Sequence, residues 1–235
     1  AERRSRRSGV DQDPSPARTV HTKSGNTTAG EDAVTNERMR IDGSGNVGSA
    51  NLYEHVGKGW VYPVAVVEIF VKGTVPIWVA LFVLDIDRSS AYMIGPPLLT
   101  LAGNNWSVFL KLQGGRGIAV AGGTLLALTP LLAVACAVIS IGGWKLTKNS
   151  GLWVLISLTL LPVLAYLLHD NLNLVWYTFG ILGLVVLKRL SSNWTPFPED
   201  VSRKKVLFNR LLQDRDVSDR TDWVRRIPEG SLGIK

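Results

Sequence analysis

The sequence predicts an all-α fold, specifically a polytopic bundle of helices embedded in a membrane. Hydrophobic residues make up 46% of the 235 residues. The polar residues concentrate in about forty positions at each end of the chain and in a few short loops. Between residues 60 and 187, apolar runs with Gly, Pro and Trp inside or beside them are long enough to span the hydrocarbon layer. A water-soluble domain would need far more polar positions in this region.

Six apolar segments are expected to enter or cross the bilayer. They cover residues 60–84, 90–103, 118–128, 131–146, 151–168 and 172–187. As one helix, the stretch from 118 to 144 would be roughly 40 Å long, which is more than one crossing needs. The positive-inside rule also places Arg116 and Lys145 on the same side. We therefore expect a turn at Thr129-Pro130, preceded by a short and partly buried helix.

The charge pattern indicates topology and contact with anionic headgroups. The chain carries 26 Lys and Arg against 19 Asp and Glu, a formal net charge of +7. With basic residues on the cytoplasmic side, the loops at 43–58 and 103–117 and the segment at 188–194 all lie on that face. Nucleic-acid binding is disfavoured, because the basic residues are not interleaved with exposed aromatics. The single cysteine, Cys136, lies in an apolar run and excludes a disulfide framework within one chain.

The chain divides into three parts. Residues 1–40 are polar and are expected to be disordered. Residues 41–194 form the membrane domain, and residues 195–235 form a basic cytoplasmic tail. Within that tail, Phe208, Leu211 and Leu212 beside Arg210 predict either a helix lying on the membrane surface or solvated disorder.

Two glycine-rich segments precede apolar stretches and predict phosphate-binding loops. Glycine leaves backbone N–H groups accessible to an anion, and a helix N-terminus adds partial positive charge at the same place. An ordinary turn between helices is the alternative for each segment taken alone. The segments are Gly43-Ser44-Gly45-Asn46-Val47-Gly48-Ser49-Ala50-Asn51 and Gln113-Gly114-Gly115-Arg116-Gly117.

Together with two further motifs, these segments resemble the bacterial acyl-phosphate:glycerol-3-phosphate acyltransferases, the PlsY family, over residues 41–194. The further motifs are Lys72-Gly73 with a proline at 76, and Gly103-Asn104-Asn105-Trp106-Ser107-Val108-Phe109. The resemblance implies a seven-helix enzyme of the bacterial inner membrane, of which about six helices are visible here. Such an enzyme moves an acyl group from acyl phosphate to the 1-hydroxyl of glycerol 3-phosphate, giving lysophosphatidic acid and phosphate for phospholipid biosynthesis. No acyl-CoA, acyl carrier protein, metal or other cofactor is implied.

The resemblance also implies a set of substrate- and phosphate-binding residues, none of them assigned as catalytic. Acyl phosphate is already activated, so its site needs hydrogen-bond donors for phosphate oxygens and good positioning more than a strong nucleophile. The expected residues are Ser44, Gly45, Asn46, Gly48, Asn51, Lys72, Asn104, Gly114, Gly115, Arg116, Gly117 and Asn193.

Several of these residues have a simpler interpretation. Lys72 lies within an apolar span one turn after Glu68, a spacing that also suits a purely structural ion pair. Arg116 offers a forked donor for phosphate, but a cation at this border would equally set topology. Asn51 could serve as a helix cap, and Asn193 could belong to a basic segment at the membrane border.

The chain departs from the family pattern at several positions. Glu54 stands where the family usually has arginine, Asn104 where it commonly has histidine, and Gln113 where it commonly has a basic residue. The third motif around Asn193 lacks its histidine, and residues 1–40 are too polar to supply the family's first helix. These departures leave open a non-catalytic membrane relative that binds lipid precursors or a partner. A small transporter, suggested only by Lys72, Glu68 and glycines within the membrane, is a third hypothesis.

Overall fold

The computed structural model describes residues 58–194, 196–198 and 201–216. Our predictions for residues 1–57, including the first glycine-rich segment and Glu54, therefore lie outside the described residues. The described elements are all helical: α3 (Lys58–Val66), η1 (Val67–Thr74), α4 (Val75–Phe82), η2 (Ala91–Ile94), α5 (Gly95–Asn105), η3 (Val108–Leu110), α6 (Ile118–Leu128), α7 (Pro130–Thr147), α8 (Ser150–Leu168), α9 (Leu172–Ser191), η4 (Ser192–Trp194) and α10 (Arg203–Gln213).

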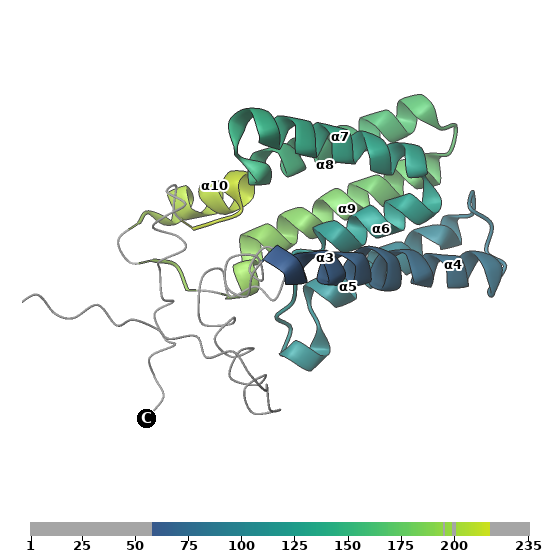
Figure 1. The fold of residues 1–235 in the computed structure, drawn as a ribbon, viewed down its shortest axis with the longest axis horizontal. Helices are drawn as coiled ribbons and strands as arrows, with labels where there is room; N and C mark the ends of the chain where they lie inside the picture. Colours follow the sequence, from purple (N-terminus) through teal and green to yellow (C-terminus); the bar gives the residue numbers. More distant parts are fainter. Residues whose placement is uncertain (1–57, 195, 199–200, 217–235) are drawn as a thin grey trace, which may run out of the picture.

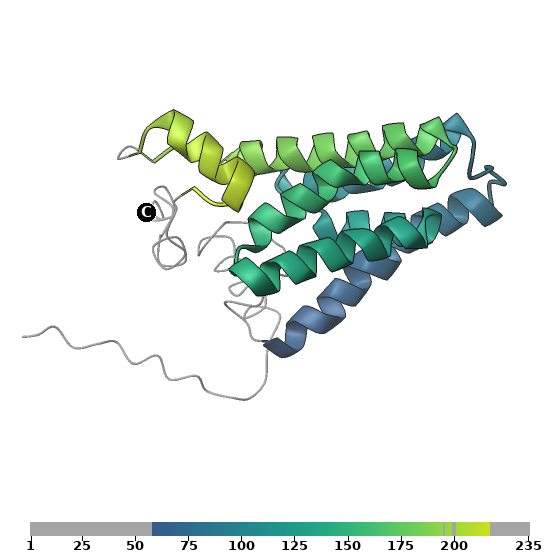
Figure 2. The same ribbon diagram turned by 90° about the horizontal axis from the view of Figure 1, so that it is seen from above.

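The helices pack side by side along the longest axis of the molecule (Figure 1). The first helical rod, formed by α3, η1 and α4, crosses the others at an angle (Figure 2). In the described part of the chain, four helices are long and apolar enough to cross a membrane, namely Tyr62–Phe82, Pro130–Thr147, Ser150–Leu168 and Leu172–Trp194. Each of the six predicted segments is helical, although α5 and α6 are too short for a full crossing.

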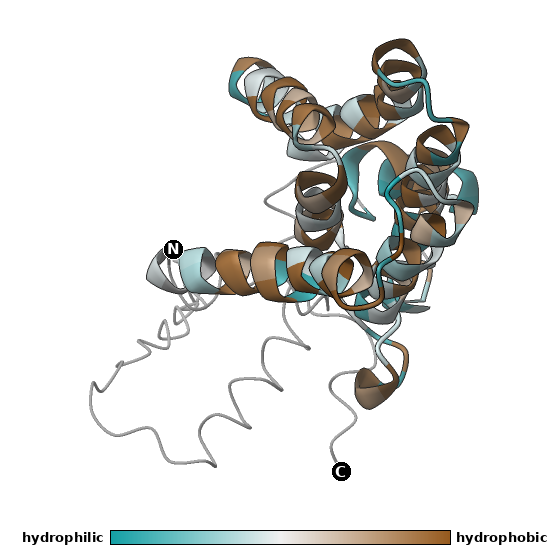
Figure 3. Ribbon diagram, turned by 90° about the vertical axis from the view of Figure 1, so that its right-hand side faces the viewer, coloured by the Kyte–Doolittle hydropathy of each residue, from teal (hydrophilic) through white to brown (hydrophobic). Residues whose placement is uncertain are grey.

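The helices consist largely of hydrophobic residues, as the brown ribbons of Figure 3 show, and many of these side chains are exposed. Tyr166 is 70% exposed and Val138 is 65% exposed on two of the long helices. Side chains of this kind are stable at a surface only where lipid replaces water. The protein is thus an integral membrane protein.

The short helix α6 is largely buried, which agrees with the short and partly buried helix that the sequence predicted. It ends at Leu128, and α7 begins at Pro130, so the predicted turn at Thr129-Pro130 is confirmed. Most of its side chains are buried, from Val120 to Leu128. Tyr177 of α9 donates a hydrogen bond of 2.7 Å to Thr124 within this core.

Two glycines allow α6 to approach the first rod at backbone distance. A Cβ on Gly123 would lie 2.0 Å from the carbonyl oxygen of Ile69, and one on Gly73 would lie 2.7 Å from that of Val120. At the same crossing, the Thr74 hydroxyl lies 3.1 Å from the carbonyl oxygens of both Ile69 and Gly123. Here the rod is a π-helix, an irregularity that the sequence analysis did not predict.

The segment predicted as a tail contains a packed helix. α10 contacts α8 and α9, and its Val206 is fully buried. Of the two alternatives for this stretch, solvated disorder is therefore wrong for residues 203–213. Phe208, on the opposite side of the helix from Val206, is 60% exposed.

Candidate functional site

The glycine-rich loop before α6 lies directly against the end of α5. A Cβ on Gly114 would lie 2.2 Å from the carbonyl oxygen of Asn104 and 2.7 Å from that of Asn105. Gly117 has a φ of 71°, and its Cβ would collide with the Asn105 side chain. Glycine is required at both positions, because backbone contact at one and a left-handed conformation at the other leave no room for a side chain. The loop then enters α6 through its N-terminus, where partial positive charge favours an anion.

Asn193 fixes this loop to the end of α9. Its Nδ2 donates to the carbonyl oxygen of Gly114 at 3.2 Å, and the Gly114 N–H donates to its Oδ1 at 3.3 Å. The same oxygen accepts a hydrogen bond of 2.5 Å from Lys188 Nζ, which also donates to the carbonyl oxygen of Asn105. Lys188 therefore joins the ends of α5 and α9 to the glycine loop, and its ammonium lies 5.5 Å from the centre of the Trp106 ring.

A second contact links the first rod to α5. The nitrogen of Lys72 lies 4.0 Å from a carboxylate oxygen of Glu68, which confirms the predicted ion pair. Lys72 Nζ also donates to Oδ1 of Asn104 at 3.4 Å. The Lys72 side chain is 50% exposed whereas that of Glu68 is only 10% exposed. The ammonium thus lies at the surface of the site, held between a buried carboxylate and an amide.

Arg116 points its guanidinium group toward the end of α10. One terminal nitrogen donates to the carboxylate of Asp214, and the other donates to the Asp214 carbonyl oxygen at 2.9 Å. Arg189 Nε lies 4.0 Å from the other oxygen of this carboxylate. The positive charge of Arg116 acts on both Lys188 and Arg189. Two arginines, Arg116 and Arg189, therefore lie beside the Asp214 carboxylate at this end of the bundle, and Lys188 lies near Arg116.

The structure brings together the described members of the predicted set. They occupy the same end of the bundle, in two directly bonded groups: Gly114 with Asn193, and Lys72 with Asn104. Ser44, Gly45, Asn46, Gly48 and Asn51 lie outside the described residues. Four further residues at this end were not predicted as site residues, namely Asn105, Lys188, Arg189 and Asp214.

Two of these unpredicted residues are buried polar groups with unused hydrogen-bonding capacity. Asn105 is completely buried, and neither atom of its side-chain amide has a partner in the described part of the chain. Arg189 is 3% exposed, and its Nε and one terminal nitrogen likewise have no hydrogen-bond partner there. Buried donors without partners are costly and commonly mark functional sites. No sequence signal separated Arg189 from a cation at a membrane border.

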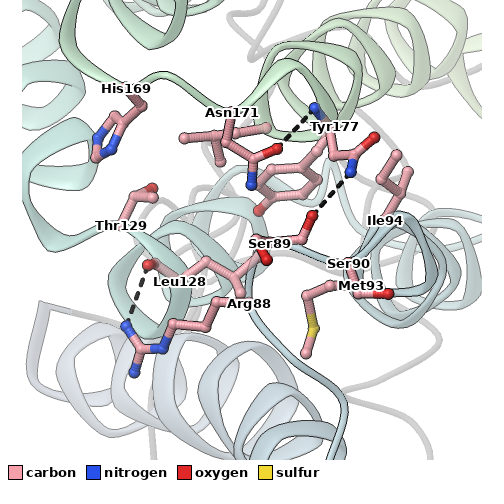
Figure 4. Close-up of a pocket in the computed structure, with 12 residues that line it drawn as sticks. Arg88, Ser89, Ser90, Met93, Ile94, Leu128, Thr129, His169, Asn171 and Tyr177 are labelled. Atoms are coloured by element: carbon pink, nitrogen blue, oxygen red, sulfur yellow. Dashed lines mark hydrogen bonds between the residues drawn. The ribbon is translucent and has the colours of Figure 1, made fainter.

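The opposite end of the bundle has a different character. It holds a cavity of about 210 Å³, lined by turns that precede η2, α7 and α9 (Figure 4). Its polar groups bond mainly to one another: Arg88 to the Leu128 carbonyl oxygen at 3.4 Å and Asn173 to that of Ser89 at 2.8 Å. His169 also lines this cavity. Of the predicted substrate-binding residues that the structure describes, none lines this cavity.

Comparison with known proteins identifies the family of the chain. Residues 31–196 match the model of the family described as glycerol-3-phosphate acyltransferase. The chain belongs to this family. The glycerol-3-phosphate acyltransferase 4 of Dehalococcoides mccartyi strain CBDB1 is 32% identical over 197 residues, covering 80% of this chain and 82% of that protein. The glycerol-3-phosphate acyltransferase of Neisseria meningitidis serogroup B is 34% identical over 155 residues, covering 66% of this chain and 76% of that protein.

The fold of this acyltransferase also matches solved structures. The glycerol 3-phosphate form of PlsY, an integral membrane glycerol 3-phosphate acyltransferase, superposes with a TM-score of 0.61 at 22% identity. That match covers 67% of this chain and 79% of PlsY. The lysophosphatidic acid form gives a TM-score of 0.60 at 21% identity, over 74% and 80% of the two chains. The predicted family and the predicted membrane-helical fold are thus both confirmed.

Proposed function

We propose that this acyltransferase moves an acyl group from acyl phosphate to the 1-hydroxyl of glycerol 3-phosphate. The products are lysophosphatidic acid and inorganic phosphate. The reaction takes place on the cytoplasmic face of a bacterial membrane, where a soluble phosphate compound meets an acyl chain held in the bilayer. The convergence of the glycine loop, Arg116 and Lys72 at one end of the bundle carries this proposal.

The proposed residues bind and orient phosphate groups. The N–H groups of the Gly114–Gly117 loop and the N-terminus of α6 supply donors and partial positive charge. Arg116 adds a forked, permanently charged donor. Lys72 adds a second cation from the first rod. As the glycerol hydroxyl attacks the acyl carbonyl, an ester C–O bond forms, the acyl–phosphate bond breaks, and the departing phosphate takes up the hydroxyl proton. Donors aimed at the departing phosphate stabilise the charge that develops on it.

One observation favours a second candidate, a relative that binds lipid precursors without turnover. Asn104 stands at a position where the family commonly has histidine, and its side chain accepts a hydrogen bond from Lys72. An amide has no titration near neutral pH and cannot take up the proton of the attacking hydroxyl. In this case the site would bind both substrates and leave them unchanged.

The two candidates differ in product formation. Purified protein in detergent micelles is supplied with palmitoyl phosphate and glycerol 3-phosphate, and lysophosphatidic acid and phosphate are measured together. We expect equal amounts of both products, in proportion to the enzyme added. Folded protein that binds glycerol 3-phosphate but forms neither product would favour the non-catalytic relative. Hydrolysis of palmitoyl phosphate without lysophosphatidic acid would contradict acyl transfer to glycerol.

A further inference from the structure

The end of α10 places a carboxylate between two arginines of the site. Asp214 follows the last residue of α10 and adopts a left-handed conformation with a φ of 60°. One carboxylate oxygen accepts from Arg116, and the other lies 4.0 Å from Arg189 Nε. The Asp214 side chain is 9% exposed, so water screens this contact weakly.

Several contacts hold Asp214 in place. Arg189 donates to the carbonyl oxygen of Leu211 at 2.8 Å, and Arg210 of α10 donates to that of Leu190 at 3.2 Å. The backbone of Gln213 packs closely against Gly151 of α8. A Cβ added to Gly151 would lie 2.6 Å from the carbonyl oxygen of Gln213. The residue before Asp214 is thus packed against α8. Each of the helices α9 and α10 also donates an arginine hydrogen bond to a backbone carbonyl oxygen of the other. Asp214 is a fixed point rather than the end of a free tail.

The surrounding charges give this fixed point a role. Arg116, Lys188 and Arg189 are like charges that repel one another, and the last two are almost completely buried. Without an anion nearby, the more exposed Arg116 side chain would be displaced toward solvent. Asp214 supplies that anion and receives two of the five N–H groups that a guanidinium carries.

The geometry points to Asp214 as a positioning residue for Arg116, which holds the guanidinium beside the glycine loop in readiness for a substrate phosphate. This inference rests on the proposed function. Asp214 lies beyond the segment that matches the family model, which ends at residue 196. The C-terminal segment of this chain thereby contributes to the phosphate-binding site.

The test compares two aspartates of the same segment. Asp216 lies two residues after Asp214 and forms an ion pair of 2.6 Å with Arg210. Its described partners include no residue of the glycine loop. Asp214→Asn should raise the KM for glycerol 3-phosphate about tenfold with a smaller change in kcat, since it weakens binding rather than chemistry. Asp216→Asn should leave both values within about twofold. Asp214→Glu should recover part of the loss.

A double-mutant cycle shows whether Asp214 acts through Arg116. In an Arg116→Ala background, Asp214→Asn should cause no further increase in KM, because the group that it orients is gone. Equal effects in both backgrounds would overturn the proposal, as would a matching loss in Asp216→Asn, which would indicate general docking of the tail. A lower KM in Asp214→Asn would also overturn it, since Asp214 would then compete with substrate.

Ligand binding separates this inference from the proposed function. Glycerol 3-phosphate should raise the thermal unfolding midpoint of the wild type and of Asp216→Asn, but raise that of Asp214→Asn much less. This pattern without any turnover would refute acyl transfer and retain the positioning role. A wild type with neither turnover nor a shift in midpoint would overturn both.

Discussion

The two ends of the helical bundle differ in the burial of their charged residues. At the motif end, Lys188 and Arg189 are buried and reach groups on other elements, including Asn105, 83 residues away. At the cavity end, Asp87 and Arg88 are both exposed; Asp87 accepts hydrogen bonds from Ser89, and Arg88 donates to the Leu128 carbonyl oxygen. Burying charge costs free energy that a simple turn does not need. The comparison therefore supports the proposed site at the motif end, where a bound phosphate would offset that cost.

The largest effect on activity is expected when the glycine loop is displaced. Gly114→Ala should lower kcat/KM about 100-fold, because the new Cβ overlaps backbone oxygens of α5 and a shift of about 1 Å misplaces the phosphate donors. Gly103→Ala on α5 is the control, since its Cβ would meet nothing within 4 Å. Steady-state kinetics with palmitoyl phosphate checks both. Equal activity of the two variants would show that the loop does not position substrate.

A smaller effect is expected for the lysine that joins the loops. Lys188→Met keeps the length and apolar stem of the side chain but removes the donor to Asn105 and Asn193. We expect kcat/KM to fall about tenfold, which corresponds to the loss of one hydrogen bond to a charged group of about 1.5 kcal/mol. The helical content, measured by circular dichroism, should remain unchanged. Full activity in this variant would make Lys188 only a cation at the membrane border.

The packing between the ends offers a matched pair of substitutions that affects stability. Gly123→Ala should destabilise the protein by about 1–3 kcal/mol, because its Cβ would overlap the backbone of the first rod. Gly122→Ala, one residue earlier on α6, meets nothing within 4 Å and should leave stability unchanged or slightly raise it. Unfolding in detergent with increasing denaturant measures both. Equal destabilisation would mean that α6 does not approach the rod as described.

The smallest effect is expected at the cavity end. Hydrogen bonds from the Ser89 side chain and then its N–H hold the pKa of Asp87 below its ordinary value of 3.8. Stability from this contact is present above that value and is lost as the pH falls through the lowered pKa. Ser89→Ala should therefore be slightly less stable than the wild type at neutral pH, with a difference that vanishes in acid and with unchanged activity. A difference that grew as the pH fell would contradict this assignment.

The sequence predicted the local features of the molecule well. The six apolar segments, the turn before Pro130 and the Glu68–Lys72 pair each depend on hydropathy or on spacing along one helix. Contacts between distant segments were not predictable in the same way. Arg116 and Asp214 are 98 residues apart, and a buried Lys188 has the same sequence pattern as a lysine in contact with headgroups. The π-helix was missed because it accompanies close packing against Gly123 of another helix.

The central claim is that acyl transfer takes place at the motif end, and it is tested most directly with two arginines. Arg116→Ala and Arg88→Ala each remove one arginine, the first beside the glycine loop and the second at the opposite end of the bundle. In one assay with palmitoyl phosphate and glycerol 3-phosphate, Arg116→Ala should lower kcat/KM about 100-fold, as expected for the loss of about 2–3 kcal/mol of charge-assisted binding. Arg88→Ala should remain within about twofold of the wild type. A large loss in Arg88→Ala with full activity in Arg116→Ala would place the reaction at the other end and contradict the account.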